Sequence, residues 1–219
     1  MKALIVEDEK FASEYLSEIL LKEFNFEQVV QAEDGEQGWD LYQKHEFSFI
    51  VLDLVLPKLD GIKLADRILK CGRGQRILAL SGECDDYTVR EVTISGILGF
   101  VQKKEMSRET LLDAFRHVFD GRVYYSESVR KIQERLWNDT DAYFRLLSGR
   151  ELEVFRSIVK SKSDEVIAKE LGLSKFTVRR HRHNAMKKLN VKNESGMIRY
   201  ALEKGIIKHR SGLDWSDTD

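Results

Sequence analysis

The stretch Phe-Ser-Phe-Ile-Val-Leu-Asp-Leu-Val-Leu-Pro-Lys-Leu-Asp-Gly, at residues 47–61, decides the fold. Its apolar run, residues 47–52, is short and bounded by turn signals, which predicts a central strand of a parallel sheet covered on both faces. The run leads into Asp53. Ligands bind at the carboxyl ends of such strands, so Asp53 is a candidate functional residue as well as a possible turn residue.

Strands and helices alternate on both sides of this segment, up to about residue 120. Short apolar segments predict strands at 3–6, 28–32, 47–52, 77–80 and 99–102. Amphipathic segments between them predict helices at 10–24, 35–44, 62–70, 86–95 and 108–119. Five such units predict an α/β fold, an open, doubly wound, five-stranded parallel sheet.

The chain after Gly121 has a different pattern. Residues 126–137 predict one polar helix, and from Ser148 onward only helices are predicted, at 149–160, 163–171, 174–189 and 195–204. The last nine residues, rich in Asp and Ser, predict a disordered tail. We therefore expect domains at 1–120 and 146–207, a linker with a helix at 121–145 and an acidic tail at 208–219.

Charge is divided unevenly along the 219 residues. Residues 1–144 hold 19 basic against 27 acidic side chains, a net charge of -8, while residues 145–210 hold 17 against 7, a net charge of +10. The basic half is a candidate for nucleic-acid binding. No window approaches the roughly 18 apolar residues of a membrane span, and the first residues are unlike a signal peptide. We expect a cytoplasmic protein without membrane contact.

Polar side chains gather at the ends of the predicted strands. Glu7 and Asp8 follow the first strand, Asp53 the third, Ser81 the fourth and Lys103 the fifth. Crowded carboxylates repel one another, and a hard divalent cation such as Mg²⁺ relieves the repulsion. Lys103 adds positive charge and Ser81 a hydroxyl donor. This arrangement suits phosphoryl transfer onto a carboxylate.

The basic half contains a helix-turn-helix spacing at Ala168, Gly172 and Val178. A small residue lets two helices approach, Gly permits the turn, and a β-branched residue packs the helices together. Ser174 caps the second helix, which displays Lys175, Arg179, Arg180, His181, Arg182 and His183. Spacing and charge together favour DNA binding over a basic face that is merely solvated.

Residues 1–120 resemble the receiver domain of bacterial two-component response regulators. The matching positions are Glu7, Asp8, Asp53, Pro57, Gly61, Ser81, Phe100 and Lys103. The resemblance implies that Asp53 accepts a phosphoryl group from a sensor histidine kinase. It also implies that Mg²⁺ is held by Asp8, Asp53 and the Val55 carbonyl, with Glu7 beside them, and that the phosphate-stabilising and switch residues are Ser81, Lys103 and Phe100.

The first half departs from this family at two positions. Glu7 stands where Asp is commoner, and Lys104 follows Lys103 where Pro or Asp is usual. We assign the lysine role to Lys103 because Phe100 then lies three residues before it, at the position of the switch aromatic.

Residues 147–207 resemble the LuxR-type helix-turn-helix of the NarL/FixJ class of regulators. The pattern is matched at Glu151, Val154, Ile167, Ala168, Leu171, Ser174, Thr177, Val178, His181, Asn184, Lys188, Leu189 and Val191. The resemblance implies that Arg179, Arg180 and His183 face base edges, whereas phosphates are held by Lys175, Thr177, His181 and Lys187. The chain departs from the pattern at Ser161, where Gly is usual, and at Glu194, where a basic or neutral residue is common.

Together the resemblances imply a two-component response regulator transcription factor. Phosphorylation of Asp53 is expected to control dimerisation and sequence-specific binding to promoter double-stranded DNA, with RNA polymerase as a further candidate partner. No enzymatic activity is expected beyond slow autodephosphorylation.

Two other readings stay open. One is a DNA-binding regulator whose degenerate receiver is controlled by protein interaction, for which Glu7 is the support. The other is a stand-alone aspartyl-phosphate phosphatase, which needs a second carboxyl two residues after the nucleophile, where Val55 stands.

Overall fold

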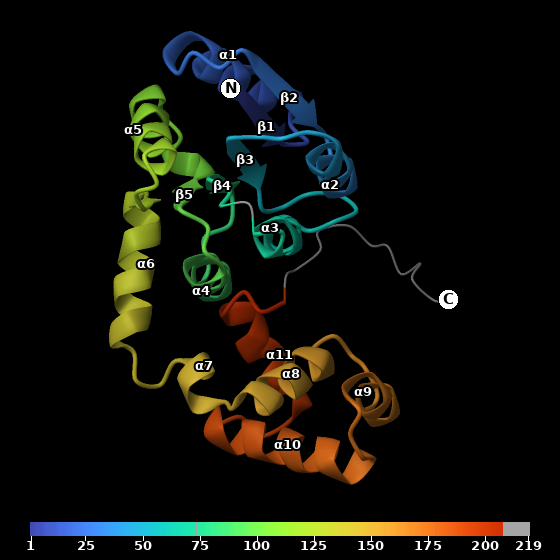
Figure 1. The fold of residues 1–219 in the computed structure, drawn as a ribbon. Helices are drawn as coiled ribbons and strands as arrows, with labels where there is room; N and C mark the ends of the chain where they lie inside the picture. Colours follow the sequence, from blue (N-terminus) through green and yellow to red (C-terminus); the bar gives the residue numbers. More distant parts are fainter. Residues whose placement is uncertain (73, 208–219) are drawn as a thin grey trace. The chain divides into compact units, whose positions relative to one another are not determined.

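The computed structural model describes residues 1–72 and 74–207 (Figure 1). The chain forms two compact units. The first holds Met1–Cys84 and Thr88–Glu134, and the second holds Asp85–Tyr87 with the chain from Arg135 onward. The predicted acidic tail, residues 208–219, lies outside the described residues.

Parallel strands form a single sheet in the first unit, in the order β2-β1-β3-β4-β5-β6. They are β1 (Lys2–Val6), β2 (Gln28–Ala32), β3 (Phe49–Asp53), β4 (Ile77–Ser81), β5 (Gly99–Gln102) and β6 (Tyr124–Tyr125). The predicted doubly wound parallel sheet is confirmed, but the strand number of five is wrong. The sequence pattern missed β6 because two residues are too short to show an alternation.

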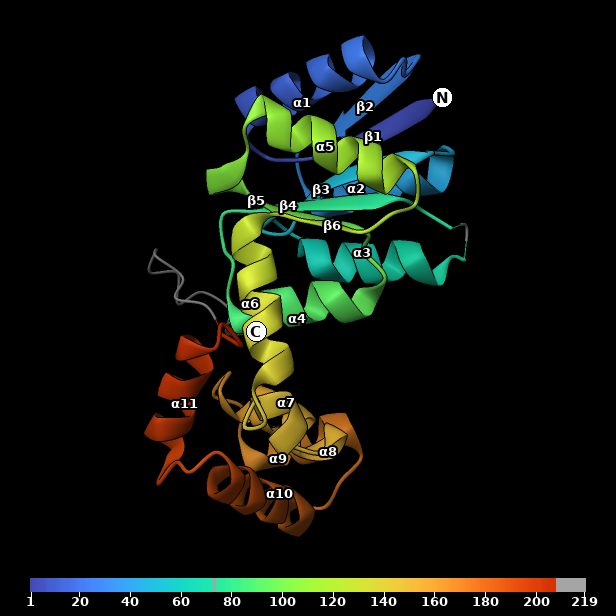
Figure 2. The same cartoon turned by 90° about the vertical axis from the view of Figure 1, so that its left-hand side faces the viewer.

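Helices cover both faces of this sheet (Figures 1 and 2). They are α1 (Lys10–Glu23), α2 (Gly35–Lys44), α3 (Gly61–Lys70), α4 (Asp86–Ser95) and α5 (Arg108–Phe119). Ala3 and Ile5 share one apolar cluster with Leu16 of α1 and Phe115 of α5. Alternate strand residues point to the opposite face, so both faces of β1 and β3 are apolar and buried.

The strand register brings the carboxyl ends of β1, β3, β4 and β5 to one edge of the sheet. Val6 pairs with Leu52, Asp53 with Leu80, and Ser81 with Gln102. A short 3-10 helix, η1 (Lys103–Glu105), follows β5 directly. The polar residues predicted at the strand ends therefore follow neighbouring strands at this edge.

The second unit is helical. After α6 (Glu127–Asn138) the chain forms α7 (Tyr143–Leu146), α8 (Gly149–Ile158), α9 (Asp164–Leu171), α10 (Lys175–Lys188) and α11 (Glu194–Glu203). Its core includes Phe155, Ala168, Val178 and Met197. The predicted helices are present, whereas α7 was missed because four residues carry too little of the helical period.

The turn between α9 and α10 has the predicted local structure. Gly172 adopts a left-handed backbone conformation, with φ of 64°, and ends α9. The Ser174 side chain then accepts a hydrogen bond from the Thr177 backbone N–H at 3.0 Å and caps α10. Ser161, where the resemblance expects glycine, is also left-handed, with φ of 59°. Within residues 1–72 and 74–207, no helix is both long enough and apolar enough to cross a bilayer.

Candidate functional site

Three carboxylates meet at the carboxyl edge of the sheet. Glu7, Asp8 and Asp53 each place an oxygen within 4.8 Å of the others. Glu7 and Asp53 are buried, whereas Asp8 is exposed. The structure thus brings together the three acidic residues that the sequence selected, through the parallel pairing of β1 with β3.

Lys103 joins two of these carboxylates. Its ammonium nitrogen lies 2.7 Å from Oδ2 of Asp53 and 2.8 Å from Oε1 of Glu7. Burial alone would lower the pKa of Lys103, but its hydrogen bonds to Asp53 and Glu7 outweigh burial and raise the pKa. Lys103 is therefore a fixed positive charge beside the candidate phosphoacceptor.

Burial dominates the ionisation of the two buried carboxyls. It raises the pKa of Glu7 to about 7, against the opposing hydrogen bond from Lys103. Burial also raises the pKa of Asp53, and the charge of Asp8 adds to this effect, while Lys103 and the Val55 N–H oppose it. One lysine does not compensate for the desolvation of both groups.

The donor set fits a hard divalent cation. Its atoms are carboxylate oxygens, which Mg²⁺ prefers, and Oε2 of Glu7 is buried without a hydrogen bond inside the described chain. A buried oxygen of this kind is costly unless something pairs with it. The exposure of Asp8 leaves a path for a cation and its waters.

The loop after β3 fixes the Asp53 carboxylate. The Val55 backbone N–H donates to Oδ1 of Asp53 at 2.9 Å. Asp60 caps α3, because its side chain accepts hydrogen bonds from the two backbone N–H groups that follow Gly61. A Cβ on Gly61 would lie 2.2 Å from the Asp53 carbonyl oxygen, so only glycine permits this close approach.

Ser81 lies on β4, the strand next to β3, and Phe100 lies on β5, the strand beyond β4. Ser81 ends β4 and is fully buried, and its Oγ accepts a hydrogen bond from the Glu83 backbone N–H at 3.0 Å. Phe100 of β5 is fully buried and pairs in register with Ala79. The structure therefore places the predicted hydroxyl on the strand beside Asp53 and the aromatic residue one strand further on.

The exposed face of α10 carries Arg180, His183 and Lys187, which the sequence selected. Phe176 lies on the same helical stripe, four residues before Arg180, and is 77% exposed. The sequence analysis missed Phe176 because an aromatic residue on an amphipathic helix normally belongs to the core. Its spacing to Arg180 and His183 was the available signal.

Two other selected residues of α10 are less exposed. Thr177 and His181 are both half-buried. The Thr177 hydroxyl is hydrogen-bonded to the Ser174 hydroxyl at 2.8 Å. Thr177 thus contributes to the helix cap, whatever else it contacts.

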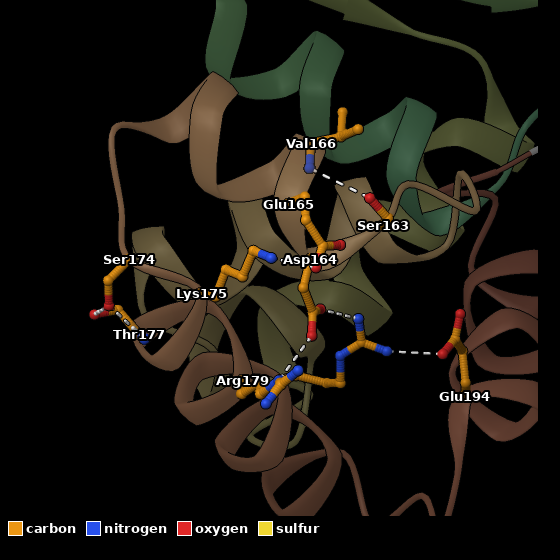
Figure 3. Close-up of polar contacts among 10 residues, drawn as sticks. Ser163, Asp164, Glu165, Val166, Ser174, Lys175, Thr177, Arg179 and Glu194 are labelled. Atoms are coloured by element: carbon orange, nitrogen blue, oxygen red, sulfur yellow. Dashed lines mark hydrogen bonds and ion pairs between the residues drawn. The ribbon is translucent and has the colours of Figure 1, made fainter.

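Acidic residues of the flanking helices pair with arginines of α10 (Figure 3). Asp164, the first residue of α9, accepts a hydrogen bond from Nε of Arg179 at 3.2 Å and another from Arg182. Arg182 also donates to Glu194 of α11 at 2.7 Å. The expectation that α10 displays Arg182 to solvent is wrong, because these pairs leave its side chain 22% exposed.

Glu151 and Lys188, both part of the LuxR-type pattern, form an internal pair. The Glu151 side chain accepts hydrogen bonds from the Ser148 backbone N–H at 2.8 Å and from Lys188 at 2.6 Å. Glu151 is buried. The pair ties the start of α8 to the end of α10 and so holds the helix-turn-helix against the rest of its unit.

A doubly wound sheet with a carboxylate cluster and a lysine at its carboxyl edge, joined to a basic helix-turn-helix, defines a regulator with a receiver and a DNA-binding domain. Residues 3–116 match the response regulator receiver domain, and residues 145–201 match the luxR family of bacterial regulatory proteins. The chain therefore belongs to the response regulator family and carries a LuxR-type DNA-binding domain, the arrangement of the NarL/FixJ class.

Known proteins share this arrangement along almost the whole chain. The oxygen regulatory protein NreC of Staphylococcus carnosus is 29% identical, covering 94% of this chain and 99% of NreC. The transcriptional regulatory protein DegU of Brevibacillus brevis is 26% identical over 96% of both chains. The structure of RcsB from Salmonella enterica serovar Typhimurium, bound to promoter rprA, is similar in fold, with a TM-score of 0.63 and 24% sequence identity. The match covers 93% of this chain and 98% of the RcsB chain.

Proposed function

We propose that phosphorylation of Asp53 by a sensor histidine kinase controls dimerisation of this regulator and its binding to promoter DNA. The observation that carries the proposal is the contact of Lys103 with both Asp53 and Glu7, inside a cluster of three carboxylates. We assign the receiver to residues 1–120, a linker to 121–145 and the DNA-binding domain to 146–207.

In the transfer step, a carboxylate oxygen of Asp53 forms a bond to phosphorus while the bond from phosphorus to the kinase histidine breaks. Asp8, Asp53, Glu7 and the Val55 carbonyl would hold Mg²⁺, which neutralises charge on the phosphoryl group when bound. Lys103 supplies a second positive charge from the protein itself. The Val55 N–H orients the carboxylate for in-line attack.

Residues on the neighbouring strands would respond to phosphorylation of Asp53. A phosphoryl group on Asp53 would compete with the carboxylates for Lys103 and draw the Ser81 hydroxyl toward it. Such a change repositions the loop after β4 and the packing of Phe100, which biases the receiver toward a dimerising surface.

The output is DNA binding by α10. Arg180 and His183, with Arg179 beside them, would contact base edges, because arginine and similar donors recognise guanine in the major groove. The side chains assigned to phosphates are Lys175, Thr177, His181 and Lys187. The net charge of +10 over residues 145–210 supports this assignment.

The remaining assignments follow from the class of protein. We place the regulator in the cytoplasm, where promoter DNA lies, without a membrane partner and with RNA polymerase as a candidate contact on the promoter. We assign no enzymatic turnover beyond slow loss of the phosphoryl group from Asp53.

One observation favours a second candidate, a receiver that acts by protein contact without phosphorylation. Burial raises the pKa of Glu7 to about 7, which favours the neutral carboxyl and weakens the attraction of the cluster for a cation.

Treatment with acetyl phosphate and Mg²⁺, followed by measurement of the intact mass, separates the two candidates. The phosphorylation proposal requires a gain of one phosphoryl group by the wild type and none by Asp53→Ala. The same mass before and after treatment of the wild type would favour the second candidate.

A further inference from the structure

The carboxylate of Asp164, which contacts two arginines of α10, has no role in the function proposed above. Asp164 contacts both Arg179 and Arg182, and Arg182 also contacts Glu194. Figure 3 labels Asp164, Arg179 and Glu194. Residues of three successive helices, α9, α10 and α11, are thereby linked.

The side chains in this series of contacts differ in their exposure to solvent. The side chains of Asp164 and Arg182 are 16% and 22% exposed, whereas that of Arg179 is 69% exposed. The inner pair is therefore shielded from solvent and fixes the Asp164 carboxylate. Arg179 stands at the surface, on the basic side of α10, and is held by the same carboxylate.

The contact with Asp164 leaves the two terminal guanidinium nitrogens of Arg179 accessible. Only Nε donates to Asp164, at 3.2 Å, and the two terminal nitrogens make no hydrogen bond within the described residues. Arginine reads guanine through a bidentate contact, and the paired terminal nitrogens are suited to it. A carboxylate at Nε restrains the long side chain in advance, so less rotamer freedom is lost on binding.

The same carboxylate disfavours contact with DNA of arbitrary sequence. Binding without sequence preference depends on cations that meet phosphates and release counterions. An arginine that is paired with Asp164 presents less net positive charge to a phosphate, and the Asp164 carboxylate repels the phosphate. Lys175 is similarly paired with Glu165 at 2.6 Å. This pair holds the pKa of Glu165 at about 2, which indicates a charge-assisted contact.

We propose that Asp164 is a specificity-determining positioning residue, which orients Arg179 toward a guanine and withholds Arg179 from the phosphates of arbitrary DNA. The proposal rests on the proposed DNA binding by α10. It gives Asp164 a role in sequence discrimination although an acidic residue opposes overall affinity for DNA.

The test uses the full chain and two DNA probes, a random 30-base-pair duplex pool and a duplex selected from that pool by the wild type. Asp164→Asn is expected to bind the random pool about five- to tenfold more tightly at 0.1 M salt, with a salt slope steeper by about 0.9, the value for one added phosphate contact. The ratio of selected to random affinity should fall by about tenfold or more.

Two controls separate positioning from a general change of charge. Glu170→Gln removes the same charge from α9, at a residue that pairs with Lys162 rather than with α10, and should leave the affinity ratio unchanged. In an Arg179→Gln background, Asp164→Asn should no longer alter the ratio. Thermal unfolding of each variant checks that the domain is folded.

An unchanged affinity ratio in Asp164→Asn would overturn the proposal, as would an equal change in the Arg179→Gln background. Selection that enriches no duplex with the wild type would instead reject the DNA-binding function, and the inference with it. An enriched duplex whose affinity ratio is insensitive to Asp164 rejects only the inference.

Discussion

Lys103 and Asp53 are 50 positions apart in the sequence, yet the Lys103 ammonium lies 2.7 Å from the Asp53 carboxylate. The same ammonium contacts Glu7 at 2.8 Å. Parallel pairing from β1 to β5 produces this geometry, because it aligns the carboxyl ends of strands that are distant in the sequence. The contact holds a positive charge where a phosphoryl group would arrive.

Removal of the Lys103 charge should affect both the stability of the fold and the phosphorylation of Asp53. We expect Lys103→Met to lower the free energy of unfolding by about 1–3 kcal/mol at pH 8, because two buried carboxylates lose their partner. Phosphorylation by acetyl phosphate should slow by about tenfold or more. Lys104→Met, at the exposed neighbouring lysine, is the matched control. Equal effects of the two variants would argue against the assignment of Lys103.

Stability without a metal should fall as the pH rises. The pKa of Glu7 is about 7 in the fold against 4.5 in the unfolded chain, so the folded state binds more protons between these values. The free energy of unfolding should therefore decrease from pH 4.5 to pH 7, by up to about 3 kcal/mol, and the raised pKa of Asp53 acts in the same direction. Urea unfolding in EDTA measures this, and Glu7→Gln should flatten the dependence. A rise in stability over this range would contradict the assignment.

A methyl group at Gly61 should disrupt the phosphoacceptor loop. Gly61→Ala places a Cβ 2.2 Å from the Asp53 carbonyl oxygen. We therefore expect the free energy of unfolding to fall by about 2 kcal/mol or more, and phosphorylation to be slower. Gly149→Ala is the control, because a Cβ there meets nothing within 4 Å and alanine favours the helix. Thermal unfolding measures the change in the free energy of unfolding relative to the wild type. The changes for the two variants should be of opposite sign or should differ by at least about 2 kcal/mol.

Phe176 should matter for DNA and not for the fold. Since its side chain is 77% exposed, Phe176→Ala should change the free energy of unfolding by less than about 0.5 kcal/mol. Its apolar ring, on the stripe with Arg180 and His183, is expected to contact DNA, so affinity for a selected duplex should fall by about fivefold or more. Phe155→Ala, at a fully buried position, should instead cost about 3–5 kcal/mol. Unaltered DNA affinity in Phe176→Ala would remove Phe176 from the interface.

The sequence predicted the features that depend on local pattern and on sheet topology. The apolar run before Asp53 and the cap at Ser174 are local, and parallel topology then places Glu7 beside Asp53. The pairing of Arg182 with Asp164 and Glu194 was not predictable, because these residues lie 18 and 12 positions apart and meet only through helix packing. The sequence did not predict β6 because its two residues, Tyr124 and Tyr125, are too few to show the alternation of a strand.

The most direct test of the account combines phosphorylation with DNA binding. Wild type and Asp53→Ala are treated with acetyl phosphate and Mg²⁺, and their intact mass and affinity for a duplex selected by the wild type are measured. We predict that the wild type gains one phosphoryl group and binds about tenfold more tightly, a typical allosteric coupling, while Asp53→Ala does neither. A phosphorylated wild type with unchanged affinity, or an Asp53→Ala variant that gains the same affinity, would contradict control of DNA binding through Asp53.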